Sequence, residues 1–303
     1  MKIYMAPMEG ITDVIFRNTY REFFGGIDKF YTPFLSPTDD RKFSNREKRN
    51  INPKINDINT VVPQLITCKS EHFIWGMKEI VQHGFREINL NLGCPSGTVV
   101  AKKKGSGFLA YPEELDKFLD EIFNAASKEN VDISIKTRLG KNDPDEFYDL
   151  LEIFNKYPIC ELTIHPRIQS DFYKNDVRIE YFDYAYNNSK NPLIYNGDIK
   201  TESDIANIKT NYPKINTIMI GRGLVARPGL SDFDLSKFKS FHDSLLLQYE
   251  EELSGERPLL WRMKEMWAFW GENFDCDKKL KALKKCQRLS VYKDIVNEII
   301  ELS

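Results

Sequence analysis

The chain has 303 residues, of which 41% are hydrophobic and 29% are charged, and its formal net charge is −2. These totals are typical of a soluble globular protein, and no apolar run approaches the roughly 20 residues that a membrane span requires. The N-terminal segment MKIYMAPMEG has no long apolar stretch after its lysine, so we expect no secretory signal. Five cysteines without a CxxC pair argue against both a disulfide framework and a metal site, and we expect a cytoplasmic protein.

Short β-rich runs alternate with amphipathic segments through the first 230 residues. The predicted strands are Ile3–Ala6, Lys29–Phe34, Val61–Ile66, Glu87–Leu92, Asp132–Thr137, Cys160–His165, Leu193–Tyr195 and Asn216–Ile220. The predicted helices between them include Thr12–Phe24, Glu71–Gln82, Pro112–Ala126 and Asp145–Asn155. Eight such units predict an α/β fold, a (β/α)8 TIM barrel. A doubly wound sheet is the weaker alternative, because no GxGxxG follows the first strand.

The pattern changes after Pro228. The residues from about Phe233 to Ser303 carry no strand signal, and segments such as LLWRMKEMWAFWGENF and LKALKKCQRLS indicate helices. We therefore predict a barrel domain over residues 1–230 and an all-helical domain over residues 231–303. The aromatic residues of WRMKEMWAFW either stack on a ligand or pack in a helical core, and their spacing favours the core.

Polar residues follow most of the predicted strands, at the end of the barrel where such folds bind ligands. The loops after the last two strands contain NGD, residues 196–198, and GRG, residues 221–223. Barrels often bind phosphate with these two loops, because glycines let backbone amides approach an anion. Arg222 adds a forked donor. We predict a phosphate-bearing ligand; the alternative is that Gly197 and Gly221 only turn the chain.

Three reactive side chains stand out at the predicted strand ends. Lys136 is either a surface lysine or a positive charge beside a ligand that becomes anionic, as reduced flavin does near N1–C2. His165 closes a strand, and we predict a role for it in the site. Cys94 opens a loop rich in glycine and lysine that we expect to be mobile, whereas the other four cysteines are expected to be structural. A nucleophilic thiol needs a lowered pKa and a proton-donating thiol needs to stay protonated, and the residues leave both roles open.

The segments APMEGITD, LNLGCPSGTVVAKKKGSGFL, IKTRLG, HPR, NGDI and MIGRG, in this order, resemble the bacterial tRNA-dihydrouridine synthases. The resemblance covers residues 1 to about 230, with a helical domain of the expected kind behind them. It implies an FMN enzyme that reduces the C5–C6 double bond of a tRNA uridine, with NADPH or NADH supplying electrons. Hydride would pass from reduced flavin to uracil, and Cys94 would be the general acid on a loop that closes over an extruded base.

The same resemblance assigns roles to further residues. Those implied to bind the cofactor are Pro7, Met8, Glu9, Gln64, Lys136, His165, Asn196, Gly197, Asp198, Gly221 and Arg222. Those implied on the substrate side are Asn91, Arg138, Lys102, Lys103 and Lys104. Family members often have glycine between His165 and Arg167, and Pro166 is expected to stiffen that turn and shift Arg167.

Three basic clusters stand out in a chain that is almost neutral overall. They are residues 41–54 (Arg41, Lys42, Arg46, Lys48, Arg49 and Lys54), Lys102–Lys104, and residues 278–288 (Lys278, Lys279, Lys281, Lys284, Lys285 and Arg288). Each cluster alone is explained by a solvated face. Together they predict a directed basic surface. The resemblance implies that the helical domain helps to hold tRNA, so we expect Lys284 and Lys285 to contact it.

Two other functions fit parts of this pattern. One is an FMN barrel enzyme that acts on a small metabolite, such as a dihydropyrimidine or dihydroorotate oxidoreductase, which would not need the basic helical tail. The other is an RNA-binding barrel that has lost catalysis, against which the presence of Cys94, Lys136 and His165 argues. We expect a monomer with no membrane partner and no metal.

Overall fold

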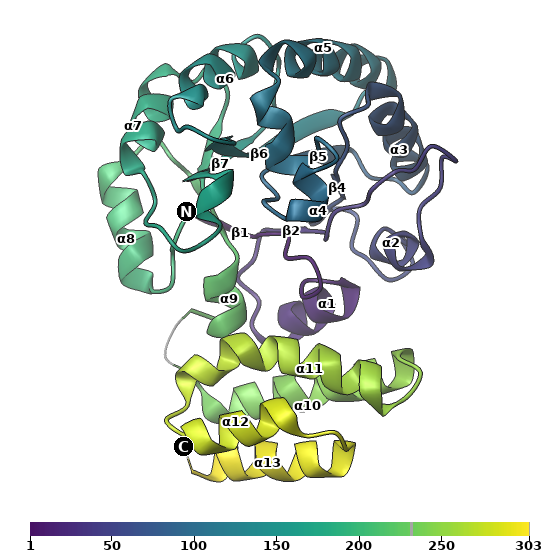
Figure 1. Ribbon diagram of the computed structural model, residues 1–303, viewed down its shortest axis with the longest axis vertical. Coiled ribbons are helices and arrows are strands. Elements are labelled where there is room, and N and C mark those ends of the chain that lie inside the picture. The colour runs from purple at the N-terminus through teal and green to yellow at the C-terminus, as the bar shows by residue number, and fades with distance from the viewer. Residues whose placement is uncertain (231–232, 303) are drawn as a thin grey trace.

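The computed structural model of the protein describes residues 1–230 and 233–302. Its central feature is a parallel sheet of nine strands in the order β3-β2-β1-β9-β8-β7-β6-β5-β4 (Figure 1). The strands are β1 Lys2–Met5, β2 Lys29–Tyr31, β3 Val61–Val62, β4 Gln64–Leu65, β5 Glu87–Leu92, β6 Asp132–Gly140, β7 Leu162–Ile168, β8 Leu193–Tyr195 and β9 Thr217–Ile220. Each of them overlaps a predicted strand.

The nine strands occupy the eight strand positions of a closed barrel, because β3 and β4 are two halves of one predicted strand. Pro63 separates them, and a proline has no N–H to donate to a strand ladder. The first half, β3, pairs with β2, and the second half, β4, pairs with β5. The Pro63 carbonyl still accepts a hydrogen bond from Asn89 N at 2.8 Å, which continues the closure. The predicted TIM barrel is confirmed.

Most of the helices form a ring around the strands, and the short α4 lies inside this ring in the view of Figure 1. The helices of this part of the chain are α1 Val14–Phe23, α2 Asn45–Asn50, α3 Ser70–Gln82, α4 Gly97–Val100, α5 Pro112–Glu129, α6 Glu146–Phe154, α7 Ile179–Asn188, α8 Glu202–Asn211 and α9 Arg222–Ala226, with the short 3-10 turns η1 Gly105–Ala110 and η2 Gln169–Asp171. Local signals set their ends: Asp13 caps α1 by accepting from Phe16 N, and Pro112 begins α5. Asn130, with φ 52°, ends α5 in the left-handed conformation.

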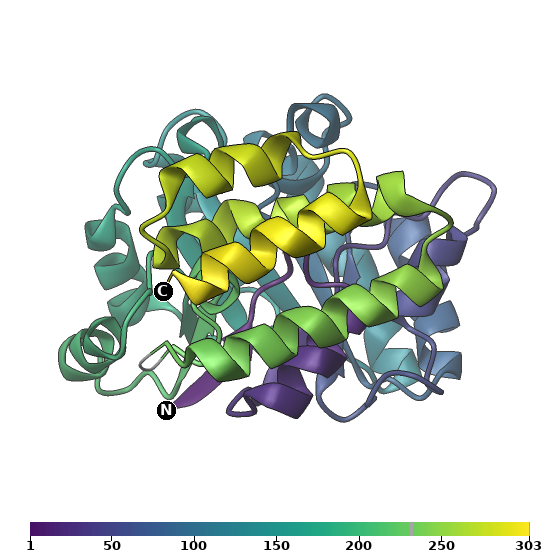
Figure 2. The same ribbon diagram turned by 90° about the horizontal axis from the view of Figure 1, so that it is seen from below.

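The C-terminal segment is helical, as predicted, and lies against one side of the barrel (Figures 1 and 2). Its elements are α10 Leu235–Glu252, α11 Glu256–Trp270, η3 Gly271–Asn273, α12 Asp277–Lys285 and α13 Leu289–Glu301. The predicted boundaries of this domain, residues 231 and 303, lie outside the described residues, so the division into two domains stays a prediction. Within residues 1–230 and 233–302, no helix is long and apolar enough to cross a membrane.

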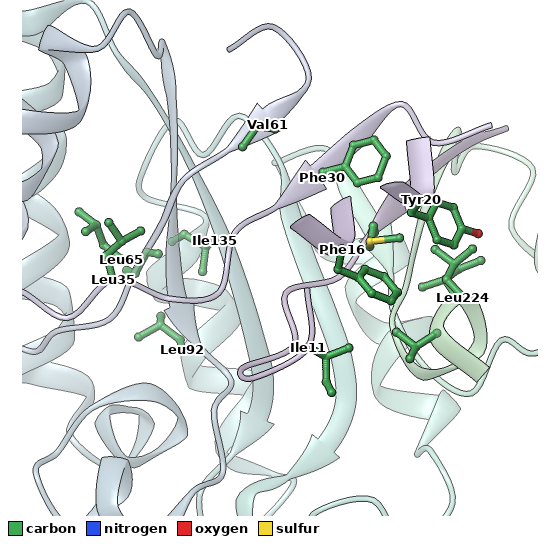
Figure 3. Close-up of a cluster of buried hydrophobic side chains, with 14 of the residues drawn as sticks. Ile11, Phe16, Tyr20, Phe30, Leu35, Val61, Leu65, Leu92, Ile135 and Leu224 are labelled. Atoms are coloured by element: carbon green, nitrogen blue, oxygen red, sulfur yellow. The ribbon is translucent and has the colours of Figure 1, made fainter. Parts of the chain in front are cut away.

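Aromatic packing joins the C-terminal helices to the barrel. Phe241 of α10 packs edge-on against Phe16 and Phe24 of the α1 region, with ring centroids 5.8 and 5.1 Å apart. Figure 3 shows Phe16 and Tyr20 in this buried layer, beside Leu224 of α9. Burying such large aromatic faces makes the contact between barrel and helices strongly hydrophobic.

The tryptophans of α11 divide into two groups. Trp267 and Trp270 are 2% and 0% exposed, so the predicted helical core is confirmed for them. Trp261 is 62% exposed, and for this residue the core prediction is wrong. The physical reason is its angle on the helix: 100° per residue places Trp261 about half a turn away from Trp270, on the side facing away from the bundle core.

The N-terminal end of the barrel contains a separate polar cluster. Lys29 Nζ donates to Glu87 Oε2 at 2.6 Å and to Glu161 Oε2 at 2.8 Å. The Tyr4 hydroxyl donates to Glu161 Oε1 at 2.7 Å. Lys29 and Glu87 are the first residues of β2 and β5, so this cluster lies at the end opposite the ligand-binding end. At that end of a TIM barrel, polar residues contribute to stability rather than to chemistry.

Candidate active site

A cavity of about 640 Å³ opens at the carboxyl ends of the barrel strands. This size is within the range of small-molecule and cofactor sites. Nine of the predicted site residues line it: Pro7, Met8, Lys136, His165, Asn196, Gly197, Asp198, Gly221 and Arg222. They come from the ends of β1, β6, β7, β8 and β9, so the strand ends bring together residues that are up to 215 positions apart in the sequence.

The C-terminal helices complete the wall of this cavity. Ala268 and Phe269 of α11, together with Glu272 and Asn273 of η3, line it beside the barrel residues. Asn273 Nδ2 donates to the Ala226 carbonyl at 2.6 Å, which fixes η3 against α9. The cavity therefore lies between the barrel and the helical segment.

The other predicted residues lie around the cavity rather than among its lining residues. Glu9 forms an exposed ion pair with Arg46 of α2 at 2.5 Å. Gln64 is fully buried, with Nε2 donating to Asn89 Oδ1 and Oε1 accepting from Asn91 Nδ2, both at 2.7 Å. The predicted contact of Gln64 with a cofactor ring stays a prediction.

Asn91 fixes the backbone around Cys94. Its Oδ1 accepts hydrogen bonds from Gly93 N at 3.0 Å and from Cys94 N at 2.9 Å. Its Cα is paired in register with that of Lys136 on the next strand. Because the amide of Asn91 is buried and used in this way, its role in the structure is to hold Cys94 in place beside the β6 end.

The loop after Cys94 has regular secondary structure, and its predicted mobility stays a prediction. It forms α4 and η1, and Gly105 to Leu109 are buried. The Cys94 carbonyl accepts from Ser106 N at 3.1 Å and from Ser106 Oγ at 2.8 Å. Gly105, with φ 57°, lies so close that an added Cβ would be 2.8 Å from that carbonyl oxygen. Glycine here allows the returning chain to pack closely against Cys94.

Arg138 is 1% exposed and supports the same region. Its Nε donates to the Gly93 carbonyl at 2.9 Å, Nη1 to Ile168 at 2.9 Å and Nη2 to Phe172 at 2.8 Å. Three of its five donors thus hold backbone carbonyls of two loops. Arg138 therefore supports the backbone next to Cys94, and its predicted role on the substrate side stays a prediction.

The electrostatics of the site favour a protonated thiol. Burial raises the pKa of the half-buried Cys94 thiol, although Ser96 N, Arg138 and Lys136 act in the opposite direction. The thiol therefore remains protonated at neutral pH, which suits a proton donor better than a nucleophile. Lys136 faces the cavity but is otherwise enclosed by protein, and burial together with Arg138 lowers its pKa to about 7.

Arg167, which was not predicted as a site residue from the sequence, connects two residues that line the cavity, His165 and Asp198. Pro166 lies within β7 rather than in a turn, and the strand continues to Ile168. Arg167 is 2% exposed; it donates to His165 Nε2 at 2.9 Å and forms a bidentate ion pair with Asp198. The predicted turn at Pro166 is wrong, because the strand continues through it, and the predicted shift of Arg167 stays a prediction.

His165 is neutral in this environment. Burial, followed by the charges of Arg138 and Lys136, holds the pKa of His165 well below its usual value. Because an arginine can only donate, Nε2 of His165 accepts and Nδ1 carries the proton. Arg222 Nη2 completes the network by donating to Asp198 Oδ1 at 2.8 Å.

Tyr173 lines the cavity and was not predicted from the sequence. Its ring is half exposed and lies near the His165 ring, with centroids 5.9 Å apart. The guanidinium groups of Arg222 and Arg138 lie 4.4 and 5.3 Å from its centroid. The loop after β7 brings it there, and no periodic pattern in the sequence predicts the path of that loop.

The predicted basic residues lie outside the cavity lining. Lys102 and Lys103 are exposed, and Lys103 forms an ion pair with Glu114 at 3.2 Å. Lys104 is partly buried and donates to Ser36 Oγ at 2.8 Å. Lys284 and Lys285 are exposed at the end of α12. Among the described residues, no group of three or more His, Cys, Asp and Glu side chains could hold a metal ion.

The sequence is similar to known proteins along most of its length. It matches the family model described as "Dihydrouridine synthase (Dus)" over residues 4–300. A "Probable tRNA-dihydrouridine synthase" of Staphylococcus aureus (strain Mu50) is 31% identical over 242 residues, which are 74% of this chain and 68% of that protein. The "tRNA-dihydrouridine synthase B" of Pasteurella multocida is 27% identical over 278 residues, which are 91% of this chain and 80% of that protein.

Solved structures support the fold alone. Morphinone reductase has a TM-score of 0.50 and 10% identity, covering 76% of this chain and 84% of its own. TcOYE with pHBA has a TM-score of 0.51 and 10% identity, covering 79% of this chain and 89% of its own. The sequence match, in contrast, begins in β1 and ends in α13, so it includes the barrel and the C-terminal helices together. The chain belongs to the dihydrouridine synthase family.

Proposed function

We propose that this protein, an enzyme of the dihydrouridine synthase family, reduces the C5–C6 double bond of a uridine in tRNA, with FMN in the cavity and NADPH or NADH as the source of electrons. The observation that carries the proposal is the position of Cys94. A thiol that burial keeps protonated is held by Asn91 beside the strand end of Lys136, which lines the cavity. This arrangement suits the delivery of a proton to a substrate held at the cavity.

The residues of the cavity fit a phosphate-bearing flavin. Gly197, Gly221 and Arg222 would hold the phosphate, as glycine loops and an arginine do in other barrels. Lys136 and His165 line the same cavity and would lie toward the ring. A negative charge beside Lys136 would favour its protonated form, because its own pKa is only about 7. When bound, reduced FMN supplies the hydride for the uracil double bond.

The proton that completes the reduction would come from Cys94 Sγ. Loss of that proton leaves a thiolate, and Arg138 and Lys136 are the positive charges that act on this sulfur. Asn91 and Ser106 hold the backbone on either side of the thiol, so its position is set before substrate binds. Such preorganisation is a large part of efficient proton transfer. The target base has to leave its stacked position in the tRNA to reach this site.

We expect Gly223→Ala to reduce the flavin content of the purified protein and to lower its melting temperature. An added Cβ at residue 223 would lie 2.2 Å from the Ile199 carbonyl oxygen, and both residues line the cavity. Overpacking of this kind typically costs about 1–3 kcal/mol. Visible absorbance per protein and a thermal melt measure the two effects. Gly97→Ala is the matched control, because no atom lies within 4 Å of its added Cβ; wild-type values for Gly223→Ala would contradict the expectation.

The double substitution Lys284→Glu with Lys285→Glu is expected to weaken tRNA binding. These exposed lysines at the end of α12 would neutralise phosphates. Each lost phosphate contact reduces the slope of log K against log salt by about 0.9, so the dependence should become flatter. Filter binding at several salt concentrations measures it. The pair Lys190→Glu with Lys209→Glu, exposed on the α7–α8 side, is the control, and an unchanged slope in the α12 variant would reject the assignment.

One experiment tests the proposed function as a whole. The purified protein is incubated with an unmodified tRNA transcript and NADPH or NADH, the RNA is digested to nucleosides, and dihydrouridine is measured by mass spectrometry. Dihydrouridine formed by a protein that retains flavin supports the proposal. Bound and reducible flavin without product from any tRNA would favour a flavin enzyme that acts on a small metabolite, and absence of flavin would reject the cofactor.

A further inference from the structure

Helix α11 exposes one large aromatic side chain. Trp261 is 62% exposed, although tryptophan is usually among the more buried residues. The remaining aromatic residues of the helix are buried or half-buried. Packing in the described part of the chain therefore gives no reason for the presence of tryptophan at this position.

The exposed side of α11 continues the wall of the active-site cavity. Residues 261, 265, 268 and 272 follow the spacing i, i+4, i+7 and i+11, so they share one side of the helical segment. Ala268 and Glu272 line the cavity, and Glu265 Oε2 lies 3.6 Å from a Cβ built on Gly10 in the loop after β1. In Figure 1, α11 runs along the side of the C-terminal helices that faces the barrel. Trp261 thus lies on a surface that leads directly into the cavity.

The other edge of the same surface meets the basic end of α12. Lys264, which lies 100° around α11 from Glu265, donates from Nζ to the Cys286 carbonyl, immediately after Lys284 and Lys285. Arg257, one turn before Trp261, is exposed. On α11, Arg257 and Lys264 therefore lie next to Trp261 on the α12 side, and Glu265 lies next to it on the side that leads to the cavity.

We infer that Trp261 stacks on an unpaired nucleobase of an RNA that passes along α11 from the basic end of α12 to the cavity. This inference rests on the proposed function and extends it to a residue of the RNA path. A flat aromatic ring stacks on any base, and basic side chains beside it attract the phosphates. A protein partner would call for further apolar side chains around the indole, whereas Arg257, Lys264 and Glu265 are charged or ionisable.

The test compares Trp261→Ala and Trp261→Phe with the wild type. Binding of an unmodified tRNA transcript is measured by filter binding at several salt concentrations. Trp261→Ala is expected to raise Kd by about 5- to 150-fold, the range for loss of one aromatic–base stack. Its salt slope should equal that of the wild type, because no charge is removed. Trp261→Phe should bind like the wild type, and Leu247→Ala, which removes another exposed apolar side chain at 58% exposure on α10, should have no effect.

The outcomes separate this inference from the proposed function. If the wild type binds tRNA and forms dihydrouridine but Trp261→Ala has an unchanged Kd, the inference alone is overturned. If the wild type neither binds nor modifies tRNA, the proposed function fails and the inference with it. If Trp261→Ala changes only the molecular mass by light scattering, a second copy of the chain covers the indole and the inference is also overturned.

Discussion

The substitution Cys94→Ala is expected to lower the rate of dihydrouridine formation by about 10²- to 10⁴-fold, the usual contribution of a positioned general acid. The reason is specific to this thiol. Burial raises its pKa, so it carries a proton at neutral pH, and Asn91 fixes its backbone beside β6. The measurement is a single-turnover reaction of the reduced enzyme with unmodified tRNA, analysed for dihydrouridine.

A matched control separates the chemistry of Cys94 from the general effect of losing a thiol. Cys68 is also partly exposed on a loop, with a pKa that burial raises, and its Sγ contacts the Lys102 carbonyl. Cys68→Ala should retain the wild-type rate, whereas Cys94→Ala should retain flavin and tRNA affinity but lose the rate. Equal rates for the wild type and Cys94→Ala would remove Cys94 from the mechanism while leaving the enzyme class in place.

The pH dependence of the rate gives a second test of Cys94 as the proposed general acid. A general acid works only when protonated, so the rate should fall as pH rises through the raised pKa of Cys94. The fall therefore occurs on the alkaline side, and the neutral range keeps full activity of this group. The alkaline fall that belongs to Cys94 should be absent from the residual activity of Cys94→Ala.

The barrel could be predicted from sequence because its signals are local. Each βα unit is a short β-rich run followed by an amphipathic segment, and each of these runs contains a strand of the barrel. What the sequence could not show is the break at Pro63, after which the pairing partner changes: β3 pairs with β2, and β4 pairs with β5. Strand pairing is a long-range property, and periodicity carries no information about it.

The site could be predicted where a residue lies within a strand or shortly after it. Lys136, His165 and Asp198 line the cavity because the parallel strands β6, β7 and β8 lead to the same side of the barrel. Arg167 was missed because its partner Asp198 comes from the loop after β8, and Tyr173 was missed because its place depends on the path of the loop between β7 and α7. The close packing of Gly105 against Cys94 could not be predicted for a related reason: a glycine in a sequence indicates conformational freedom, whereas the need for a small residue comes from tertiary contacts.

Lys29→Met is expected to destabilise the fold, although it lies far from the candidate active site. Lys29 is the cation that two carboxylates, Glu87 and Glu161, share at the N-terminal end of the barrel. Removing it would leave both carboxylates without the cation that neutralises them. We expect the free energy of unfolding to fall by about 3 kcal/mol, the low end for breaking a buried ion pair, because the Lys29 side chain keeps 24% exposure. Denaturant titration at neutral pH measures this change.

The sign of the pH dependence distinguishes this electrostatic loss from a packing defect. Burial already raises the pKa of Glu87 in the folded protein, with Lys29 opposing the shift. Without Lys29 the folded state holds a proton on Glu87 to higher pH than the unfolded state does, so stability falls as pH rises through the folded pKa. Lys29→Met should therefore be closer to the wild type at pH 5 than at pH 8. Lys117→Met removes a lysine that is 80% exposed and should change little at either pH; an equal deficit for Lys29→Met at both pH values would mean that packing, and not the shared cation, stabilises this end of the barrel.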